Sequence, residues 1–233
     1  MVFKREICSL FPREYERWES NGIKWVVQDL PPEDDEKALE IFRSDFCDDE
    51  VLCSTSGISR NPKSFQGILD FWRHCITQRT SLACYAEENG VRTLVAVNVC
   101  VPAQKVEEDN SVEIVGEEWQ NVYHSLEYIE TKCNPFEFLN LDVLLGAYGL
   151  LVKREYRGAK LGARLLNARE PLSNVLGIKA TSTVFTGISS QKLATRCGFI
   201  TIAEASLSEM AEAGLKYPKD DQRTIKLMVK KYK

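Results

Sequence analysis

The sequence has few histidines, and its cysteines are not spaced as metal-binding or redox pairs are. Only two of its 233 residues are histidine, and none of its eight cysteines forms a C-x-x-C pair. His74 and Cys75 are adjacent, so on a helix their side chains would point in different directions. We therefore expect no metal, and a zinc site or a Cys–His nucleophile is kept only as an alternative.

Long apolar runs are also absent, and no stretch approaches the roughly 20 apolar residues that a helix needs to cross a bilayer. The N-terminus, from Met1 to Glu6, is charged and lacks the apolar core of a secretory signal peptide. We therefore expect a cytoplasmic protein that binds no membrane. Its cysteines should be reduced and mostly small core residues.

Positive charge is not in excess either, because 30 Lys and Arg stand against 34 Asp and Glu, giving a net charge of −4. This balance argues against a nucleic-acid partner. Repeats, low-complexity tracts and linkers are missing, so we expect one domain over residues 23–233, acting as a monomer or weak dimer. Residues 1–22 are a polar N-terminal extension, with Glu14, Tyr15, Arg17 and Trp18 at a possible helical spacing.

The most informative stretch runs from Leu150 to Arg169. It begins as an apolar run, passes through a basic segment with two glycines, and ends with apolar residues at helical spacing. This pattern predicts a strand, a tight turn and a helix N-terminus. Gly158 and Gly162 allow a positive φ or a close ligand, and the free N–H groups of a first helical turn suit a phosphate. With the charges of Arg157, Lys160 and Arg164, the stretch predicts a pyrophosphate cradle.

The cradle has neither the G-x-x-x-x-G-K-S/T nor the G-x-G-x-x-G pattern. It resembles the acyl-CoA loop of the GNAT acetyltransferases, whose pattern is Arg/Gln-x-x-Gly-x-Gly/Ala. Here Lys160 stands at the central Gly, where its Cβ could crowd the pyrophosphate. The resemblance implies acetyl-CoA as cosubstrate, with no metal. It assigns the binding of acetyl-CoA to Leu151, Val152, Arg157, Gly158, Ala159, Lys160, Gly162 and Ala163. An ordinary strand–turn–helix with a basic turn is the alternative.

The order of predicted elements is that of an α/β protein with a mixed sheet. An Asn-Gly turn at Asn89 predicts a hairpin, and Gly146 and Gly149 suggest a bulge or a close ligand in the strand before the cradle. Strands are expected at 23–30, 81–87, 93–101, 142–153, 177–185, 198–202 and 223–232. Helices are expected from 32 to 46, at 64–77 and 117–132, from the cradle to near Pro171, and at 189–196, with a mobile acidic loop at 102–115. The order matches the GNAT fold, a central mixed, mostly antiparallel twisted sheet that is split at the acyl-CoA strand and flanked by helices.

A second resemblance is to the insect-type arylalkylamine N-acetyltransferases. The segment from Phe185 to Phe199 resembles their Thr/Ser-x-x-x-Ser…Gly-Phe pattern, with Thr186 and Ser190 at the two hydroxyl positions. The Tyr that many bacterial members carry as general acid is replaced by Ala194. The run 48–52 resembles the family's Asp-Glu-Pro-Leu, with Val replacing Pro, and the resemblance gives Glu50 the role of general base.

Each of these residues also has a plainer interpretation. The acidic run around Glu50 could be a solvated loop, Ser190 could be a helix cap, and Thr186 could simply end a strand. Cys197 lies near the site in sequence, but only Arg196 beside it would lower its pKa, so a Cys nucleophile is a minor alternative.

The chemistry agrees with the family roles. An alkylamine has a pKa of roughly 10 and arrives protonated, so a carboxylate must take its proton before it can attack the thioester. An unpaired backbone N–H near Leu151 or Val152 would stabilise the oxyanion, and Ser190 or Thr186 could orient the leaving thiolate. Direct transfer in a ternary complex is the expected mechanism.

The leading hypothesis is an acetyl-CoA-dependent N-acetyltransferase of a small primary amine. Dopamine, tyramine or serotonin are what the family implies, polyamines or agmatine are close alternatives, and a longer acyl chain is possible. A catalytically weak acyl-CoA-binding protein is the second hypothesis, because Lys160 and Val51 depart from the family pattern. A protein N-acetyltransferase, with a peptide groove formed by the insert at 102–117, is the third.

Overall fold

A computed structural model describes residues 5–106 and 112–232 of the chain, so part of the predicted loop at 102–115 lies outside the described residues. Eight strands form one sheet in the order β1-β2-β3-β4-β5-β6-β8-β7. The strands are β1 Glu14–Ser20, β2 Ile23–Asp29, β3 Leu82–Glu88, β4 Val91–Gln104, β5 Val143–Val152, β6 Ala180–Phe185, β7 Ile200–Ser206 and β8 Thr224–Lys231. Every pairing is antiparallel except that of β5 with β6, which confirms the predicted mixed, mostly antiparallel sheet.

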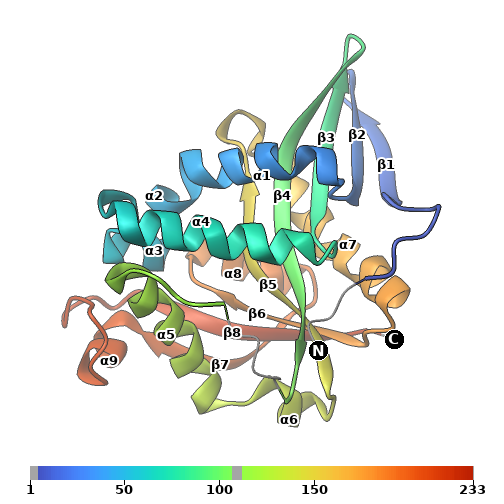
Figure 1. Cartoon of the computed structure of the whole chain (residues 1–233). Helices are drawn as coiled ribbons and strands as arrows, with labels where there is room; N and C mark the ends of the chain where they lie inside the picture. The colour runs from blue at the N-terminus through green and yellow to red at the C-terminus, as the bar shows by residue number, and fades with distance from the viewer. Residues whose placement is uncertain (1–4, 107–111, 233) are drawn as a thin grey trace.

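Helices cover both faces of the sheet (Figure 1). The α-helices are α1 Asp35–Ile41, α2 Cys47–Asp49, α3 Val51–Ser56, α4 Pro62–Thr77, α5 Glu117–Lys132, α6 Pro135–Leu139, α7 Leu161–Leu176, α8 Ile188–Arg196 and α9 Leu207–Glu212. The larger core lies under α1, α4 and α5, and includes Phe42, Trp72 and Trp119. A second core packs α7 against β2, β3 and β4. Strand β4 supplies buried residues to both cores.

The sheet is split between β5 and β6. These parallel strands share a single pair, Leu145 with Thr181, and separate beyond it. The rest of β5, from Gly146 to Val152, pairs with β4 only, so its other edge is open toward β6. The predicted split at the acyl-CoA strand is thereby confirmed.

A bulge lies in β5 next to the split. Asn98 of β4 pairs with Leu150, whereas Cys100 pairs with Ala147, so Tyr148 and Gly149 are accommodated opposite one residue. Gly149 has φ +136°, and a Cβ there would lie 2.6 Å from Cε1 of Phe42. The predicted bulge therefore has a physical reason for its glycine, in both backbone conformation and space.

Four local features differ from the sequence prediction. Residues 14–20 form the edge strand β1, paired with β2, and not a helix. Helix α7 continues past Pro171 to Leu176, because Leu172 is buried and Gly177 supplies a left-handed cap. Residues 42–46 form a π-helical turn, and α9 lies between the strands predicted at 198–202 and 223–232, where no element was predicted.

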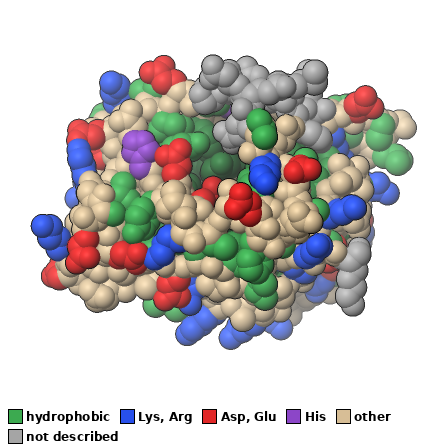
Figure 2. All heavy atoms as spheres, turned by 90° about the horizontal axis from the view of Figure 1, so that it is seen from below, with side chains coloured by type: hydrophobic (Ala, Val, Ile, Leu, Met, Phe, Trp, Pro, Cys, Tyr) green, Lys and Arg blue, Asp and Glu red, His purple; other side chains and the backbone are tan. Residues whose placement is uncertain are grey.

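The lower face of the molecule in Figure 1 is hollowed. Viewed from that side, hydrophobic side chains line the hollow, and Asp and Glu side chains lie around it (Figure 2). No helix in the described part of the chain is both long and apolar enough to cross a membrane.

Candidate active site

The predicted cradle lies between β5 and α7. A 3-10 turn, Arg154–Tyr156, follows β5, and α7 begins at Leu161. The five consecutive backbone N–H groups from Gly158 to Gly162 donate no hydrogen bond to any described residue. Together with the dipole of a 16-residue helix, they have the arrangement that the predicted pyrophosphate cradle requires. We call residues 157–162 the phosphate loop.

Lys160 has the backbone conformation that a glycine would adopt. Its φ is +60° and its ψ is +18°, in the left-handed region, and it directly precedes α7. Only glycine enters this region without a steric penalty. The structure therefore explains the family's preference for Gly, and shows that Lys accepts the same turn.

Two arginines of this turn are held by Asp49. Nη2 of Arg157 lies 2.7 Å from Oδ2 of Asp49, and Nη2 of Arg154 lies 2.9 Å from its Oδ1. Burial alone would raise the pKa of Asp49, but the hydrogen bonds from these arginines outweigh it and lower that pKa below 3.8. We call these residues, with Asp45 at 3.4 Å from Arg154, the Asp49 cluster.

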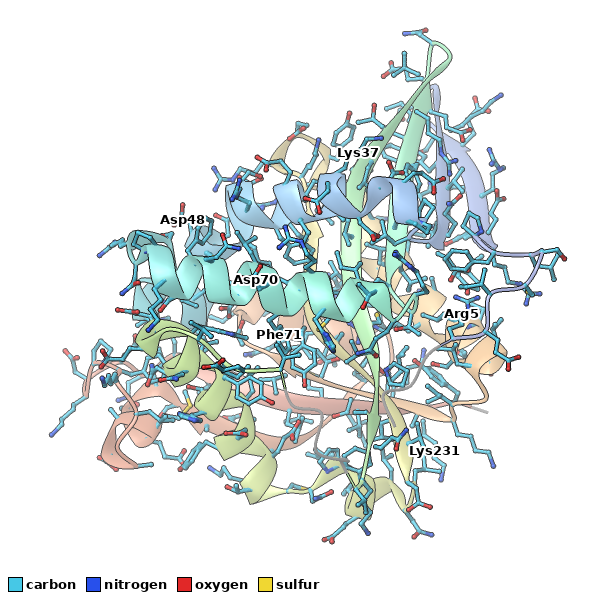
Figure 3. All side chains as sticks on the ribbon, viewed as in Figure 1. Arg5, Lys37, Asp48, Asp70, Phe71 and Lys231 are labelled. Atoms are coloured by element: carbon cyan, nitrogen blue, oxygen red, sulfur yellow. The ribbon has the colours of Figure 1, made fainter. Side chains whose placement is uncertain are left out.

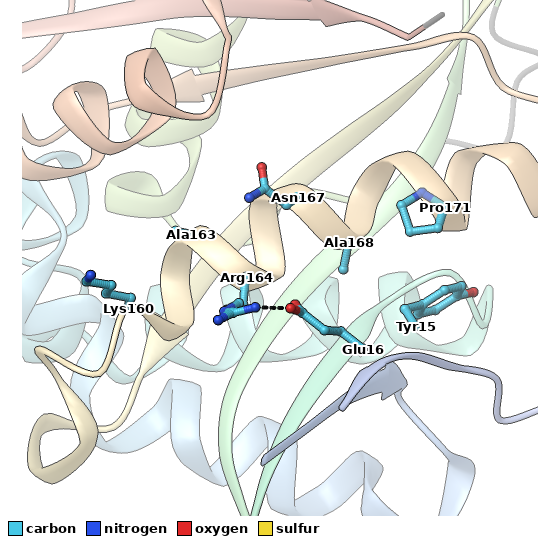
Figure 4. Close-up of a pocket in the computed structure, with 8 residues that line it drawn as sticks. All are labelled: Tyr15, Glu16, Lys160, Ala163, Arg164, Asn167, Ala168 and Pro171. Carbon is cyan, nitrogen blue, oxygen red and sulfur yellow. Dashed lines mark hydrogen bonds and ion pairs between the residues drawn. The ribbon is translucent and has the colours of Figure 1, made fainter. Parts of the chain in front are cut away.

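The start of α7 also faces β1. Arg164 forms an ion pair with Glu16, and its guanidinium lies 4.5 Å from the centre of the Trp18 ring. A cavity of about 470 Å³ lies beside this pair, between β1 and α7 (Figure 4). Its lining includes Lys160 and Ala163, so it borders the phosphate loop.

Glu50 caps the short helix α3. Its Oε1 accepts a hydrogen bond from Leu52 N at 3.0 Å, and its Oε2 accepts one from Cys53 N at 2.7 Å. The acidic run therefore ends α2 and begins α3, where the helix dipole favours an acid. The run is neither a plain solvated loop nor a free cluster, since Asp48 accepts a hydrogen bond from Ser59 and Asp49 binds the arginines. Figure 3 shows Asp48 at α2, beside the start of α4.

Ser190 lies in the first turn of α8. Its hydroxyl donates to Gly187 O at 2.8 Å and accepts from Gly187 N at 3.3 Å. Ser190 therefore takes part in capping the start of α8, in agreement with its plainer interpretation as a capping residue. Thr186 follows β6 and is half-buried. The neighbouring Gln191 donates to Thr224 O at 2.7 Å, which fixes α8 to the start of β8.

The start of β8 connects the two halves of the predicted site. Arg223, directly before β8, donates to Thr55 of α3 at 2.8 Å. Its pKa is raised, first by hydrogen bonding to Asp221 and in smaller part by the charge of Glu50. Helices α3 and α8, whose first turns carry Glu50 and Ser190, are therefore both linked to the start of β8.

The open edge of β5 offers backbone donors to the split. Lys153 N donates to Val95 O at 2.9 Å, which fixes the alternation of the antiparallel pair. By that alternation the N–H groups of Val152 and Leu150 face away from β4, and that of Leu151 faces toward it. Of the two residues expected to supply the oxyanion donor, the register leaves Val152 free and excludes Leu151, and it leaves Leu150 N–H free in the same way.

Cys197, the cysteine considered as an alternative nucleophile, is poorly suited to that role. Each of the eight is free, and burial raises the pKa of Cys197, which reduces its thiolate fraction. No group of three or more His, Cys, Asp or Glu side chains that could hold a metal occurs among the described residues.

Two residues beside the bulge were missed by the sequence analysis. Asn98 is fully buried in β4, and Arg169 of α7 is 1% exposed and contacts it. A polar residue at position 98 in an otherwise apolar strand was the available signal. An aromatic group on the opposite side, at Phe71, Trp119, Tyr123 and Tyr148, was also not anticipated. Phe71 points from α4 toward α5 (Figure 3).

Solved structures of insect N-acetyltransferases are similar to this chain over nearly its whole length. A putative arylalkylamine N-acetyltransferase 7 of the mosquito Aedes aegypti is 28% identical, with a TM-score of 0.89 and 98% of each chain covered. A mosquito arylalkylamine N-acetyltransferase-like 5b is 26% identical, with a TM-score of 0.74, covering 89% of this chain and 99% of its own.

A Drosophila melanogaster polyamine N-acetyltransferase, which forms N-acetylagmatine, shares the fold at 18% identity, with a TM-score of 0.71 and coverage of 89% and 99%. No protein-family model and no curated protein matches the sequence. The split sheet and the phosphate loop agree with these similarities: the chain has the fold of the GNAT acetyltransferases, and it is similar over most of its length to insect arylalkylamine N-acetyltransferases.

Proposed function

We propose that this protein transfers the acetyl group of acetyl-CoA to a small primary amine, by direct attack in a ternary complex. The observation that carries the proposal is the row of five free N–H groups from Gly158 to Gly162, placed at the end of the open edge of β5. A row of N–H donors at a helix N-terminus suits a pyrophosphate, and the open strand edge suits the amide-rich arm that links it to the thioester.

The phosphate loop would hold the pyrophosphate of acetyl-CoA. Gly158, Ala159, Lys160 and Gly162 supply N–H groups, and Ala163 belongs to the same first turn of α7. Arg157 adds positive charge at the rim, and the backbone of Leu151 and Val152 lines the route into the split. Bound acetyl-CoA supplies an activated thioester, and the remaining work falls to side chains of this chain.

Glu50 is proposed as the general base. The substrate amine, with a pKa of roughly 10, must lose a proton before it attacks. Each carboxylate oxygen of Glu50 accepts one backbone N–H, and a carboxylate oxygen can accept more than one hydrogen bond, so a water can still bind. Proton removal through such a water is consistent with the cap role, and the cap fixes the carboxylate in place.

Thr186 and Ser190 are proposed to orient the leaving thiolate. Thr186 directly follows β6 and Ser190 lies in the first turn of α8, on the far side of the split from β5. The thiolate of CoA has a pKa near that of Cys, about 8.5, so it can leave without a strong acid. A hydroxyl that donates one hydrogen bond is sufficient, and Ser190 would have to turn from Gly187 O to make it.

An arylalkylamine such as dopamine, tyramine or serotonin is the proposed substrate class. An apolar hollow with acidic residues around it suits a molecule with an apolar body and one cationic end (Figure 2). Polyamines and agmatine carry a second cation, which needs a second free carboxylate. Asp48 and Asp49 are already engaged by Ser59 and by two arginines, so they favour the monoamine.

We further propose that the protein acts in the cytoplasm on small molecules, as a monomer or weak dimer with one catalytic domain over residues 23–233, to whose sheet the preceding segment adds the edge strand β1. A binding protein without turnover is the second candidate, because Lys160 departs from the family pattern in the loop itself. Its left-handed backbone keeps the loop open for N–H donors, which supports acyl-CoA binding in both candidates, so turnover distinguishes them.

Calorimetric titration with acetyl-CoA, followed by thiol-release assays with aryl-, poly- and guanidino-amines, tests the proposal. We expect acetyl-CoA to bind and arylalkylamines to give the highest kcat/KM. Binding without turnover on any amine would support the binding-protein alternative. Absence of binding would contradict both.

A further inference from the structure

The guanidinium of Arg169 is buried beside the split without a carboxylate partner. Its side chain leaves α7 and is 1% exposed, yet none of the described acidic residues forms an ion pair with it. Its hydrogen-bond acceptors are neutral: Nε lies 2.8 Å from Asn98 Oδ1, and Nη1 lies 2.8 Å from Thr183 Oγ1 and 3.4 Å from Thr181 Oγ1. A buried charge held only by neutral groups carries a desolvation penalty that packing alone does not explain.

These contacts place Arg169 across the split. Asn98 lies on β4, the two threonines lie on β6, and β5 runs between them. The guanidinium therefore bridges strands that flank β5 at the point where β5 and β6 begin to separate, just beyond the Leu145–Thr181 pair. Near this point β5 carries two small residues, Ala147 and Gly149, one on each side of Tyr148 in the sequence.

Asn98 transmits this contact to the bulge. Its Nδ2 donates to Gly149 O at 2.7 Å, while its Oδ1 accepts from Arg169. Accepting from a guanidinium polarises the amide, which makes its N–H a stronger donor. On the opposite face, Trp72 Nε1 donates to Tyr148 O at 2.7 Å, so both carbonyls of the bulge are fixed by side chains.

The Gly149 carbonyl determines where the next N–H points. In a planar trans peptide the C=O and N–H vectors are opposed, so fixing Gly149 O toward Asn98 fixes Leu150 N–H in the opposite direction. The alternation of the β4–β5 pair also turns that N–H away from β4. Leu150 N–H is thus held as a preset donor beside the split.

We propose that Arg169 and Asn98 are positioning residues that aim Leu150 N–H at the thioester carbonyl of the bound acyl donor. The inference rests on the proposed function, because it concerns the same transfer. A preset donor that needs no reorientation when the oxyanion forms is worth about 10²–10³ in kcat where it contacts the oxyanion directly. Substitution of Asn98 or Arg169, which fix this donor, should therefore lose part of that factor in kcat.

Asn98→Asp is the sharpest variant. It keeps an acceptor for Arg169 and forms a buried ion pair with it, but it removes the donor to Gly149 O and places a carboxylate against that carbonyl. We expect kcat to fall about 10- to 100-fold, while the Kd of CoA, which lacks the acetyl carbonyl, changes less than about twofold. Thr183→Val is the matched control, because it removes one contact of Arg169 on β6 and leaves Asn98 in place. Its kcat should fall far less.

Arg169→Met removes the charge and keeps the length of the stem, and should lower kcat in the same direction as Asn98→Asp. If Arg169→Met does not fold, the kcat and the CoA affinity of Asn98→Asp still test the proposal. A kcat within about twofold of wild type in folded Asn98→Asp would overturn the proposal. A parallel loss of CoA affinity and kcat would also overturn it, since it would indicate a merely structural role.

A second readout does not depend on turnover. We expect the Leu150 amide to exchange its hydrogen faster, and its NMR resonance to shift, in Asn98→Asp but not in Thr183→Val. An unchanged Leu150 amide would overturn the inference even in an active enzyme. If the wild-type protein binds no acetyl-CoA, the proposed function fails. The exchange and NMR measurements on the Leu150 amide still test whether Arg169 and Asn98 fix that amide.

Discussion

Single residues of the site carry two roles at once. Glu50 is a helix cap and the proposed base, and Ser190 is both a cap and a proposed thiolate partner. Lys160 combines a left-handed backbone with a positive charge at the phosphate loop. A substitution that keeps one role and removes the other is therefore more informative than deletion of the side chain.

Lys160→Gly should relieve strain and remove one charge. Relief of the left-handed conformation is worth about 1–2 kcal/mol, and the added entropy of a glycine offsets about 0.5–1 kcal/mol of it. We expect a melting temperature between unchanged and about 4 °C higher. At low salt the Kd of acetyl-CoA should rise up to about fivefold, because an exposed charge contributes at most about 1 kcal/mol.

Calorimetry at low and high salt, with thermal melts, checks this prediction. Lys160→Ala is the control, since it removes the charge and keeps the strain, so its affinity should match that of the glycine variant while its melting temperature should not rise. Tighter binding in both variants would contradict a favourable role for the charge and indicate that the side chain obstructs the site.

At the scale of elements, the Asp49 cluster joins α2 to the turn between β5 and α7. Asp49 lies next to Glu50 in sequence, so the same short segment carries the proposed base and the partner of two arginines of the loop. Because the pKa of Asp49 is lowered, the stability that it contributes is present above its unfolded value of 3.8. That contribution is lost only as the pH falls through the still lower folded value.

Asp49→Asn should release Arg154 and Arg157 for the phosphates. Exposed ion pairs are worth about 0–1 kcal/mol, so we expect acetyl-CoA to bind up to about fivefold more tightly. The effect should be constant between about pH 6 and 9, where Asp49 is fully ionised, and should shrink at high salt. Titration calorimetry over that pH range measures it.

Asp48→Asn is the matched control, because Asp48 is bonded to Ser59 and not to the arginines. Weaker binding of acetyl-CoA in Asp49→Asn would show that the cluster positions the arginines for the cofactor and does not compete with it.

At the scale of the whole molecule, the N-terminal segment is fastened to the sheet. Nη1 of Arg5 lies 2.6 Å from Oδ1 of Asp29, which is fully buried, and Tyr15 OH donates to the same oxygen at 2.8 Å. Arg13 N donates to the other oxygen of Asp29 at 2.8 Å. The extension expected at 1–22 therefore carries strand β1 of the same sheet, tied to it through one buried carboxylate.

Arg5→Met should lower the free energy of unfolding by about 3 kcal/mol, because it leaves a buried carboxylate without its counter-charge. Urea unfolding followed by circular dichroism measures the change. Arg17→Met, in an exposed pair with Glu14, should cost less than about 1 kcal/mol. Equal losses in the two variants would contradict the special role of the buried pair.

The sequence indicated the regular elements well where periodicity and turn residues agreed. The helix at 117–132, the Asn-Gly hairpin and the glycine bulge in β5 all occur as predicted. Strand β1 could not be recognised from its own residues, which are polar and mostly exposed. It is held in place by pairing with β2 and by the hydrogen bond of Tyr15 to Asp29, which lies 9 residues beyond the end of β1 at Ser20.

The candidate site also has one part that local sequence predicts and another part that it does not. The phosphate loop is local in sequence, so motif and glycine spacing located it. Asn98 and Arg169 lie 71 residues apart and meet only when α7 packs under β4. No spacing rule connects them, and the same holds for Asp49 with Arg154 and Arg157.

The measurement that tests the central claim most directly is the pH dependence of amine acetylation by the wild type and Glu50→Gln. Release of CoA and formation of the N-acetylamine should be followed together with an arylalkylamine as acceptor. Gln keeps an oxygen for the α3 cap, so the fold should be retained, whereas Glu50→Ala should also lose about 1 kcal/mol of stability.

We predict one N-acetylamine for each CoA released, and a kcat/KM in Glu50→Gln about 10²–10⁴-fold below wild type at neutral pH. The deficit should shrink as the pH rises toward the amine pKa of roughly 10, because more of the amine is then neutral without a base. Equal activity of Glu50→Gln and wild type at neutral pH would contradict the role of Glu50. No CoA release by the wild type with any amine would contradict the function itself.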